Sequence, residues 1–163
     1  MVKNLDIGDS APDFALPSDD GRSVSLKALR GKAIVVYFYP KDDTTACTAE
    51  AMAFNALGQE FAALGAAILG VSPDSRAAHA KFKQKHDLSL TLAADETKAT
   101  IEAYGVWREK SMYGRKYMGV ERTTFLIDAA GRIARVWRKV RVRGHADEVL
   151  AATAALGKAF ANG

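Results

Sequence analysis

Short apolar runs alternate with amphipathic stretches along the chain, and this order predicts alternating strands and helices. Residues 33–39 are continuously apolar and rich in β-branched and aromatic side chains, which is typical of a strand buried on both faces. Pro40 should end this strand, because proline cannot donate a hydrogen bond to a sheet ladder. Residues 66–71 form a second apolar run. The pattern therefore predicts two buried strands with a helix-length segment between them.

That intervening segment, residues 45–64, predicts one helix, because its large apolar residues recur at helical spacing. Gly65 follows it and favours a helix end. After the second strand, Ser72 and Pro73 predict the start of another helix, with serine as the N-cap and proline in the first helical position. This helix should run to about residue 86.

The remaining segments predict two hairpins and two helices. Listed in chain order, these are a hairpin of residues 14–16 and 23–26, a short helix over 98–104, a long loop over 107–120, a hairpin of 123–127 and 133–140, and a closing amphipathic helix over 145–160. A strand–helix–strand order requires parallel strands joined by a right-handed crossover. Together these elements describe a thioredoxin-like α/β fold, with a central mixed β-sheet flanked by helices and an N-terminal β-hairpin as an extension.

The composition is that of an ordinary globular protein. Hydrophobic residues make up 48% and charged residues 26% of the 163, so we expect one domain over residues 1–163. The chain start lacks the apolar core of a signal peptide, and no apolar run approaches the ~20 residues of a membrane span. We therefore expect the cytoplasm as the compartment and no membrane partner.

Cysteine and histidine usage gives no sign of a metal centre. The single cysteine, Cys47, excludes an intramolecular disulfide and a cysteine-rich zinc site. His79, His86 and His145 show no metal-binding spacing with carboxylates or with Cys47, so we interpret them as surface or capping residues. No metal and no cofactor is expected.

The chain has a net charge of +4, and its basic excess is concentrated in one strip. The strip contains six cations, which are Arg132, Arg135, Arg138, Lys139, Arg141 and Arg143. Such a strip can bind nucleic acid, and a non-catalytic binding module is the alternative function that it suggests. Because apolar residues interleave with the charges, as in a strand with one wet face, we favour a solvated strand and do not expect nucleic acid as a partner.

Two further groups of polar and aromatic residues can be interpreted as structural. Asp42 and Asp43 are interpreted as turn and capping residues rather than as a general acid pair. Trp107, Tyr113 and Tyr117 either line a substrate or partner groove or pack under the expected loop, and both interpretations stay open.

A lone thiol at a strand-to-helix junction is either an inert packing residue or a nucleophile. An unperturbed thiol is only a few per cent ionised at neutral pH, so a nucleophile needs features that favour the thiolate. Cys47 falls in the first turn of a predicted helix, where backbone N–H groups and the helix dipole favour an anion. Thr44 can donate a hydroxyl hydrogen bond, and Pro40 shields one side of the site. Arg122 precedes a predicted strand that should neighbour the strand before Pro40, which would bring its guanidinium to the thiolate.

These residues resemble the peroxidatic motif of the peroxiredoxins, Pro-x-x-x-Thr-x-x-Cys, which here is formed by Pro40, Thr44 and Cys47. Other segments resemble the bacterioferritin comigratory protein branch, also called the Q-type peroxiredoxins. These are residues 8–14, 37–44, 104–107, 110–114, 122–128 and 139–145. The resemblance covers nearly the whole chain in register.

The resemblance implies a thiol-dependent peroxidase that reduces hydrogen peroxide and small organic hydroperoxides through a cysteine sulfenic acid. Carried over by position, Cys47 would be the peroxidatic nucleophile, and Thr44 would hydrogen-bond the thiolate and the peroxide. Arg122 would stabilise the thiolate and polarise the O–O bond. Pro40 would shield the site, and Glu50 would orient Arg122.

The chain departs from the family in two places. Thr45 and Ala46 stand where Pro and Gly commonly precede the nucleophile, a change that removes no catalytic side chain. Met52 stands where many members carry a resolving cysteine, and there is none near Lys83, where others carry it. A sulfenic acid at Cys47 therefore cannot close an intramolecular disulfide, and the resemblance implies a one-cysteine mode.

The missing cysteine moves reduction to another molecule. The expected partner is an external thiol reductant, which is thioredoxin, glutaredoxin or a low-molecular-weight thiol. A disulfide oxidoreductase on the same fold would need Cys-x-x-Cys, and Glu50 occupies the second cysteine position. By resemblance, the protein is expected to be a monomer or a weak dimer.

Overall fold

Strand β3 (Ala33–Phe38) lies at the centre of the fold, and every one of its side chains after Ala33 is buried. It pairs in parallel with β4 (Ala66–Ser72) and antiparallel with β8 (Thr123–Ile127). The predicted neighbourhood of these strands is therefore confirmed. The edges of this five-stranded mixed sheet are β5 (Thr91–Ala94) and β9 (Ile133–Trp137), in the order β5-β4-β3-β8-β9.

The computed structural model describes residues 4–162. Residues 1–3 and 163 belong to the domain expected over residues 1–163, and the first three belong to the chain start considered for a signal peptide. They lie outside the described residues. No helix within the described range is long and apolar enough to cross a membrane.

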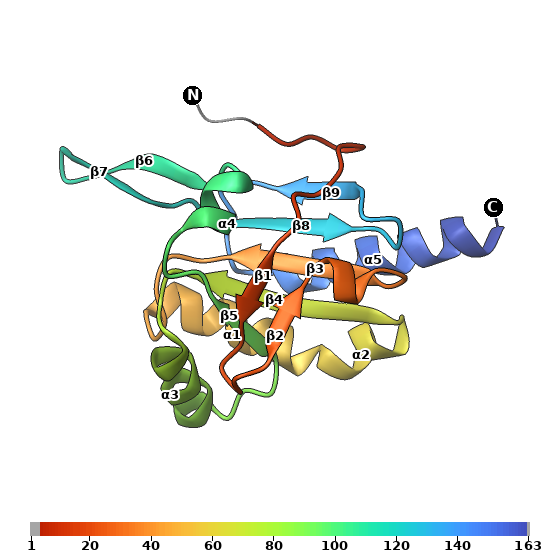
Figure 1. The fold of residues 1–163 in the computed structure, drawn as a ribbon, viewed down its shortest axis with the longest axis horizontal. Helices are drawn as coiled ribbons and strands as arrows, with labels where there is room; N and C mark the ends of the chain where they lie inside the picture. Colours follow the sequence, from red (N-terminus) through yellow and green to blue (C-terminus); the bar gives the residue numbers. More distant parts are fainter. Residues whose placement is uncertain (1–3, 163) are drawn as a thin grey trace.

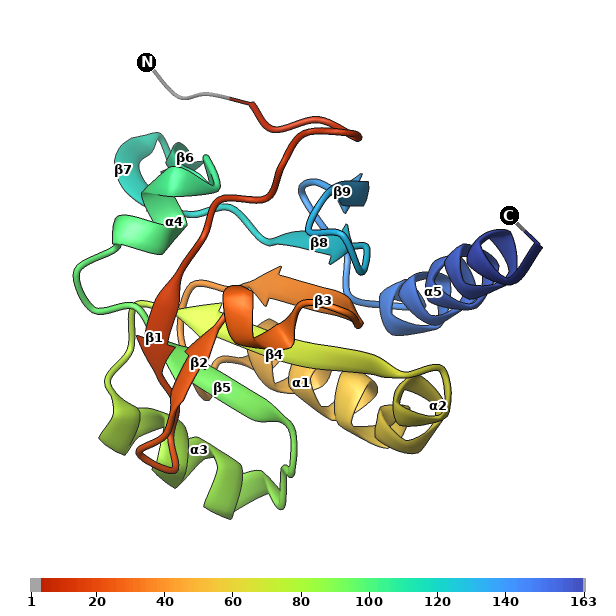
Figure 2. The same cartoon turned by 45° about the vertical axis from the view of Figure 1, so that its right-hand side comes forward.

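The two faces of β3 enter two separate apolar clusters. Ile34 and Phe38 point into a cluster with residues of the N-terminal hairpin and of α4. Tyr37 points into the other cluster, which holds Cys47 and Phe54 of α1. The elements on these faces are β1 (Ala15–Pro17), β2 (Ser23–Ser25), η1 (Lys27–Leu29) and α4 (Ala99–Ala103) on the first, and α1 (Thr45–Ala56), α2 (Gly58–Ala63), α3 (Arg76–His86) and α5 (His145–Asn162) on the second. Figures 1 and 2 show this layered arrangement, and it confirms the thioredoxin-like α/β class.

The helices differ from the predicted ones in two places. The helix expected over residues 45–64 breaks at Leu57, which caps the end of α1 and the start of α2. The second predicted helix start was wrong, because Ser72 is the last residue of β4 and pairs with Ala94. The N-cap of α3 is Ser75, whose hydroxyl accepts a hydrogen bond from Ala78 N at 3.1 Å.

The segment 107–120 was predicted as a loop and is a β-hairpin. It consists of β6 (Trp107–Met112) and β7 (Arg115–Val120), which pair antiparallel outside the central sheet. Tyr113 and Gly114 form the two-residue turn, and both have positive φ angles (53° and 78°). A two-residue turn with positive φ at both positions matches the twist of the flanking strands. Asn-Gly is the usual sequence signal for such a turn, and Tyr-Gly is a weak one. In Figure 1 the hairpin projects from the body of the protein.

We predict that Gly70→Ala lowers the free energy of unfolding by about 1–3 kcal/mol through overpacking. Gly70 lies in β4, and a Cβ added there would meet Tyr37 Cζ at 2.7 Å and Leu92 Cδ2 at 2.8 Å. Both neighbours are 0% exposed and have little room to shift. Urea unfolding, with the slope unchanged, measures the loss.

Gly157→Ala is the matched control, because a Cβ there meets no atom within 4 Å and the residue lies in α5. It should leave stability unchanged or raise it by up to ~1 kcal/mol. Equal midpoints for the two variants would contradict the packing argument at Gly70.

Candidate active site

Cys47 lies in the first turn of α1, which begins two residues earlier at Thr45. Its side chain is 1% exposed and packs in the apolar cluster that contains Tyr37 and Ala51. The backbone N–H groups of a first helical turn have no acceptors within the helix, so they concentrate positive potential at this point. The structure thus buries the thiol at a helix start whose free backbone N–H groups favour an anion.

Arg122 reaches the thiol from the segment directly before β8, the strand that neighbours β3. Its Nη2 donates a hydrogen bond to Cys47 Sγ at 3.3 Å, and its Nη1 donates to Glu50 Oε1 at 2.6 Å. Arg122 sits between β7 and β8, directly before Thr123, which pairs with Phe38. The antiparallel pairing therefore delivers the guanidinium to the end of β3 from which the chain runs to Cys47.

Glu50 holds the guanidinium from within α1, three residues after Cys47. The carboxyl group is 1% exposed, and its Oε2 has no hydrogen-bond partner among the described residues. Burial raises the pKa of Glu50 to about 7, although Arg122 acts in the opposite direction. The carboxyl therefore carries both a favourable ion pair and an unsatisfied buried oxygen.

Thr44 does not make the expected contact with the thiol. It is the N-cap residue of α1 with an extended backbone, and its hydroxyl donates to Lys41 O at 3.1 Å. With its proton used there, Thr44 Oγ1 keeps its lone pairs free to accept a hydrogen bond. Pro40 follows β3 and is half-buried.

Lys110 of β6 is a second cation near the thiol that the sequence analysis missed. Its Nζ donates to Val120 O at 2.9 Å, across the hairpin. Burial lowers the pKa of Lys110 and Arg122 adds to this effect, while a thiolate at Cys47 would oppose it. Only the location of Lys110 in a segment that resembles the family, residues 110–114, pointed to it beforehand.

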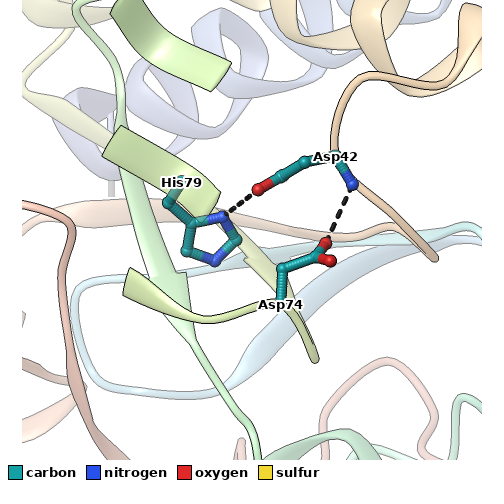
Figure 3. Close-up of side chains that lie close together, drawn as sticks. All are labelled: Asp42, Asp74 and His79. Carbon is teal, nitrogen blue, oxygen red and sulfur yellow. Dashed lines mark hydrogen bonds and ion pairs between the residues drawn. The ribbon is translucent and has the colours of Figure 1, made fainter. Parts of the chain in front are cut away.

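His79 was interpreted as a surface or capping residue, and that interpretation was wrong. Its side chain is 0% exposed, Nδ1 lies 2.7 Å from Asp42 Oδ2, and Nε2 lies 3.1 Å from Ala93 O. Figure 3 shows Asp42 between His79 and Asp74, with Asp42 N donating to Asp74 Oδ2 at 2.8 Å. Asp42 also accepts a hydrogen bond from Tyr39 Oη at 2.6 Å, so it belongs to a partly buried hydrogen-bond network and is more than a turn residue.

The cluster of Asp42, Asp74 and His79 also corrects the expectation that no histidine meets carboxylates at metal-binding distance. One ligand atom from each lies within 4.8 Å of the others. However, both ring nitrogens already have partners, because His79 Nε2 lies 3.1 Å from Ala93 O and Nδ1 lies 2.7 Å from Asp42 Oδ2. These bonds satisfy the ring without a cation. We interpret the cluster as a support that attaches the segment before α1 to α3 and β5.

Comparisons with known proteins identify the family of the chain. The model of the AhpC/TSA family matches residues 7–136. Peroxiredoxin Bcp of Bacillus subtilis is 49% identical over 146 residues, which are 90% of this chain and 93% of that protein. Peroxiredoxin Bcp of Escherichia coli K12 is 40% identical over 146 residues, which are 90% of this chain and 94% of that protein.

Solved structures point to the same family. The bacterioferritin comigratory protein of Xanthomonas campestris, studied for alkyl peroxide reduction activity, superimposes with a TM-score of 0.86 and 43% identity, over 94% of this chain and 98% of that one. Peroxiredoxin Q of the same organism has been solved as two different Cys→Ser mutants, so it has at least two cysteines. The present chain has one and lacks a resolving cysteine. It belongs to the AhpC/TSA family and is a peroxiredoxin of the bacterioferritin comigratory protein (Q-type) branch, a thiol-dependent peroxidase.

Proposed function

We propose that Cys47 is the peroxidatic nucleophile and that the enzyme works in a one-cysteine mode, on hydrogen peroxide and small organic hydroperoxides. The observation that carries this proposal is the hydrogen bond from Arg122 Nη2 to the buried Cys47 sulfur, at 3.3 Å. An inert packing cysteine has no need of a guanidinium, whereas a thiolate in a nearly closed pocket does. The non-catalytic alternative receives no support from a chain that belongs to a peroxidase family.

In the first step, the Cys47 thiolate attacks the terminal oxygen of the peroxide. A sulfur–oxygen bond forms, the O–O bond breaks, and the leaving alkoxide or hydroxide takes a proton, so the products are a sulfenic acid and an alcohol or water. Negative charge moves from sulfur to the departing oxygen. Arg122 is held by Glu50 beside the sulfur, so its remaining N–H groups can stabilise the charge at both positions without reorganisation.

Thr44 takes a modified role in this proposal. Because its hydroxyl proton is directed to Lys41 O, Thr44 Oγ1 accepts the O–H of the bound peroxide instead of donating to the thiolate. The free N–H groups at the start of α1 donate to the peroxide oxygens. Pro40 limits access of water from the side of β3.

In the second step, an external thiol reduces the sulfenic acid, because the chain offers no second cysteine. A thiol attacks the sulfur, water leaves, and a mixed disulfide forms. A second thiol then releases Cys47 and leaves a disulfide in the reductant. We propose the cytoplasm as the compartment, because thiol reductants are kept reduced there. A monomer or a weak dimer remains the expected assembly.

Cys47→Ser should abolish peroxide-dependent turnover and leave the fold intact. Intact mass after one equivalent of peroxide should show a gain of about 16 Da in the wild type and none in the variant. Circular dichroism before treatment serves as the control for folding. Turnover by the serine variant at the wild-type rate would refute the role of Cys47.

Arg122→Ala should slow oxidation of Cys47 by about 100-fold, the usual cost of removing one preorganised donor. The change also leaves Glu50 buried without its partner, so the double variant Arg122→Ala/Glu50→Gln accompanies it. Stopped-flow measurement of sulfenic acid formation gives the rate. Folded protein of both variants that reacts as fast as wild type would remove Arg122 from the mechanism.

Glu50 should make stability depend on pH. Its pKa of about 7 in the folded state lies above the ordinary value of 4.5, so the folded protein holds this proton more tightly than the unfolded chain. The contribution of this proton to the free energy of unfolding is complete below pH 4.5. It is lost as pH rises through 7, and the loss amounts to up to ~3 kcal/mol. Urea unfolding at pH 4.5, 6 and 7.5 should show the wild type losing stability relative to Glu50→Gln. Parallel profiles would show that the carboxyl does not titrate in this way.

A further inference from the structure

The β6–β7 hairpin exposes more large apolar side chains than any other element described. Met112, Tyr113, Tyr117 and Met118 are 57%, 99%, 41% and 50% exposed, whereas only Ile7, Met52 and Leu64 are comparably exposed elsewhere among the described residues. The turn end of the hairpin projects from the body, while Trp107 and Val120 at its base pack on the core (Figure 1). A patch of this kind on a projecting element marks an interaction surface.

The two faces of the hairpin differ in what they carry. Lys110 pairs with Tyr117 and Met112 pairs with Arg115, so these four side chains share one face. Lys110 Nζ donates to Val120 O at 2.9 Å, two residues before Arg122, so this side chain lies beside the segment that carries the active-site arginine. This set, which we call the Lys110 face, therefore extends from the candidate active site along the hairpin. Lys116 and Met118 lie on the opposite face.

Positive charge surrounds the same region. The hairpin, residues 107–120, carries four cations and one acid, and the segment 138–143 carries four cations and no acid. Val140 N donates to Arg122 O at 3.0 Å, so that segment lies beside the active-site arginine. These two stretches hold a net charge of +7 in a chain whose total is +4, so the rest of the chain carries −3. The cationic character belongs to this region and not to the protein as a whole.

We propose that the Lys110 face of the hairpin is the docking surface for the external reductant, and that this reductant is a dithiol protein with an acidic face. The proposal rests on the one-cysteine mode proposed above, because without a resolving cysteine the first thiol that attacks the Cys47 sulfenic acid must come from another molecule. The reaction that follows docking consumes both thiols of the partner. Cys47 sulfenic acid is reduced to the thiol, the partner becomes a disulfide, and one water is released.

The surface fits this partner better than two others. A small thiol needs only a pocket beside the sulfur, whereas Tyr117 and Met112 extend an apolar surface well away from Cys47. A second copy of this chain would bring the same cluster of positive charge against itself, which opposes self-association. An acidic protein gains steering from the cations and burial from the apolar residues.

The test compares two pairs of matched variants on opposite faces of the hairpin. Tyr117→Ser and Arg115→Glu alter the Lys110 face, while Met118→Ser and Lys116→Glu make similar changes on the other face. Peroxide turnover is measured with thioredoxin, with glutaredoxin and with dithiothreitol, a small neutral dithiol that needs no docking surface. Sulfenic acid formation is measured separately by stopped flow.

The two variants on the Lys110 face should lower kcat/KM for the protein reductant about tenfold, and those on the other face should lower it less than about threefold. Turnover with dithiothreitol and the rate of sulfenic acid formation should stay unchanged. Raising the salt concentration from about 20 to about 300 mM should slow only reduction by the protein, most of all in the wild type. Failure of sulfenic acid formation in the wild type would instead overturn the proposed peroxidase mechanism, so the two failures are distinguishable.

Three outcomes would overturn the docking proposal. The first is an equal loss of kcat/KM for the protein reductant in the variants of both faces. The second is reduction of the wild type by glutathione or dithiothreitol but by neither protein, which would point to a small-thiol site. The third is co-sedimentation of the wild type with anionic phosphatidylserine vesicles that Tyr117→Ser abolishes while protein reduction is unaffected, which would make the hairpin a membrane contact.

Discussion

The active site depends on the antiparallel pairing of β3 with β8. Phe38, the last residue of β3, pairs with Thr123, the first residue of β8. Two loops therefore leave the sheet at the same point, one leading to Cys47 and the other coming from Arg122. Because β3 is buried on both faces and β8 at every position, a slip in this register would move entire sets of core side chains. The packed core thus fixes the register of β3 and β8, and with it the distance between the Cys47 thiol and the Arg122 guanidinium.

The chemistry at this point works against stability. A carboxyl, a guanidinium and a thiol lie together in a largely buried pocket, and Glu50 leaves one oxygen unpaired. Buried ion pairs recover little more than their desolvation cost, so Glu50 and Arg122 are not explained by a contribution to stability. They are explained by a cation that must be held beside the sulfur before the peroxide arrives. This desolvation cost is confined to the three groups, and the two apolar clusters on either side of β3 supply the stability around them.

The sequence predicts the parts of the structure that follow from local patterns. The continuous apolar run predicts β3, and its neighbour β8 predicts that Arg122 reaches Cys47. The features that it misses depend on long-range or weak signals. His79 meets Asp42 across 37 positions of the chain, so no spacing rule reveals the pair. The hairpin of β6 and β7 has polar strands and a Tyr-Gly turn, which lack the alternation and the Asn-Gly signature that mark hairpins.

Helix α3 holds the segment that precedes Cys47, and this bears on how the sulfenic acid is reduced. Two successive aspartates attach the segment: Asp42 bonds to His79, and Asp43, with a φ of 62°, bonds to Lys85 Nζ at 2.6 Å and to His86 Nε2 at 2.8 Å. In a relative with a cysteine on this helix, such contacts would have to break before a disulfide could form across them. This chain has no cysteine there, so nothing within the molecule draws the segment away from α3.

The sulfur stays 1% exposed in this arrangement, and a thiol from another molecule must still reach it. A protein reductant is too large to enter beside the sulfur as a small thiol does, so it gains access with free energy from contacts that it makes elsewhere on the surface. A surface that begins at Lys110 and continues outward along the hairpin lies where such contacts would act. The chain has no resolving cysteine, so the first thiol must come from another molecule. We infer that docking on the exposed cationic hairpin brings the thiol of a protein reductant to Cys47.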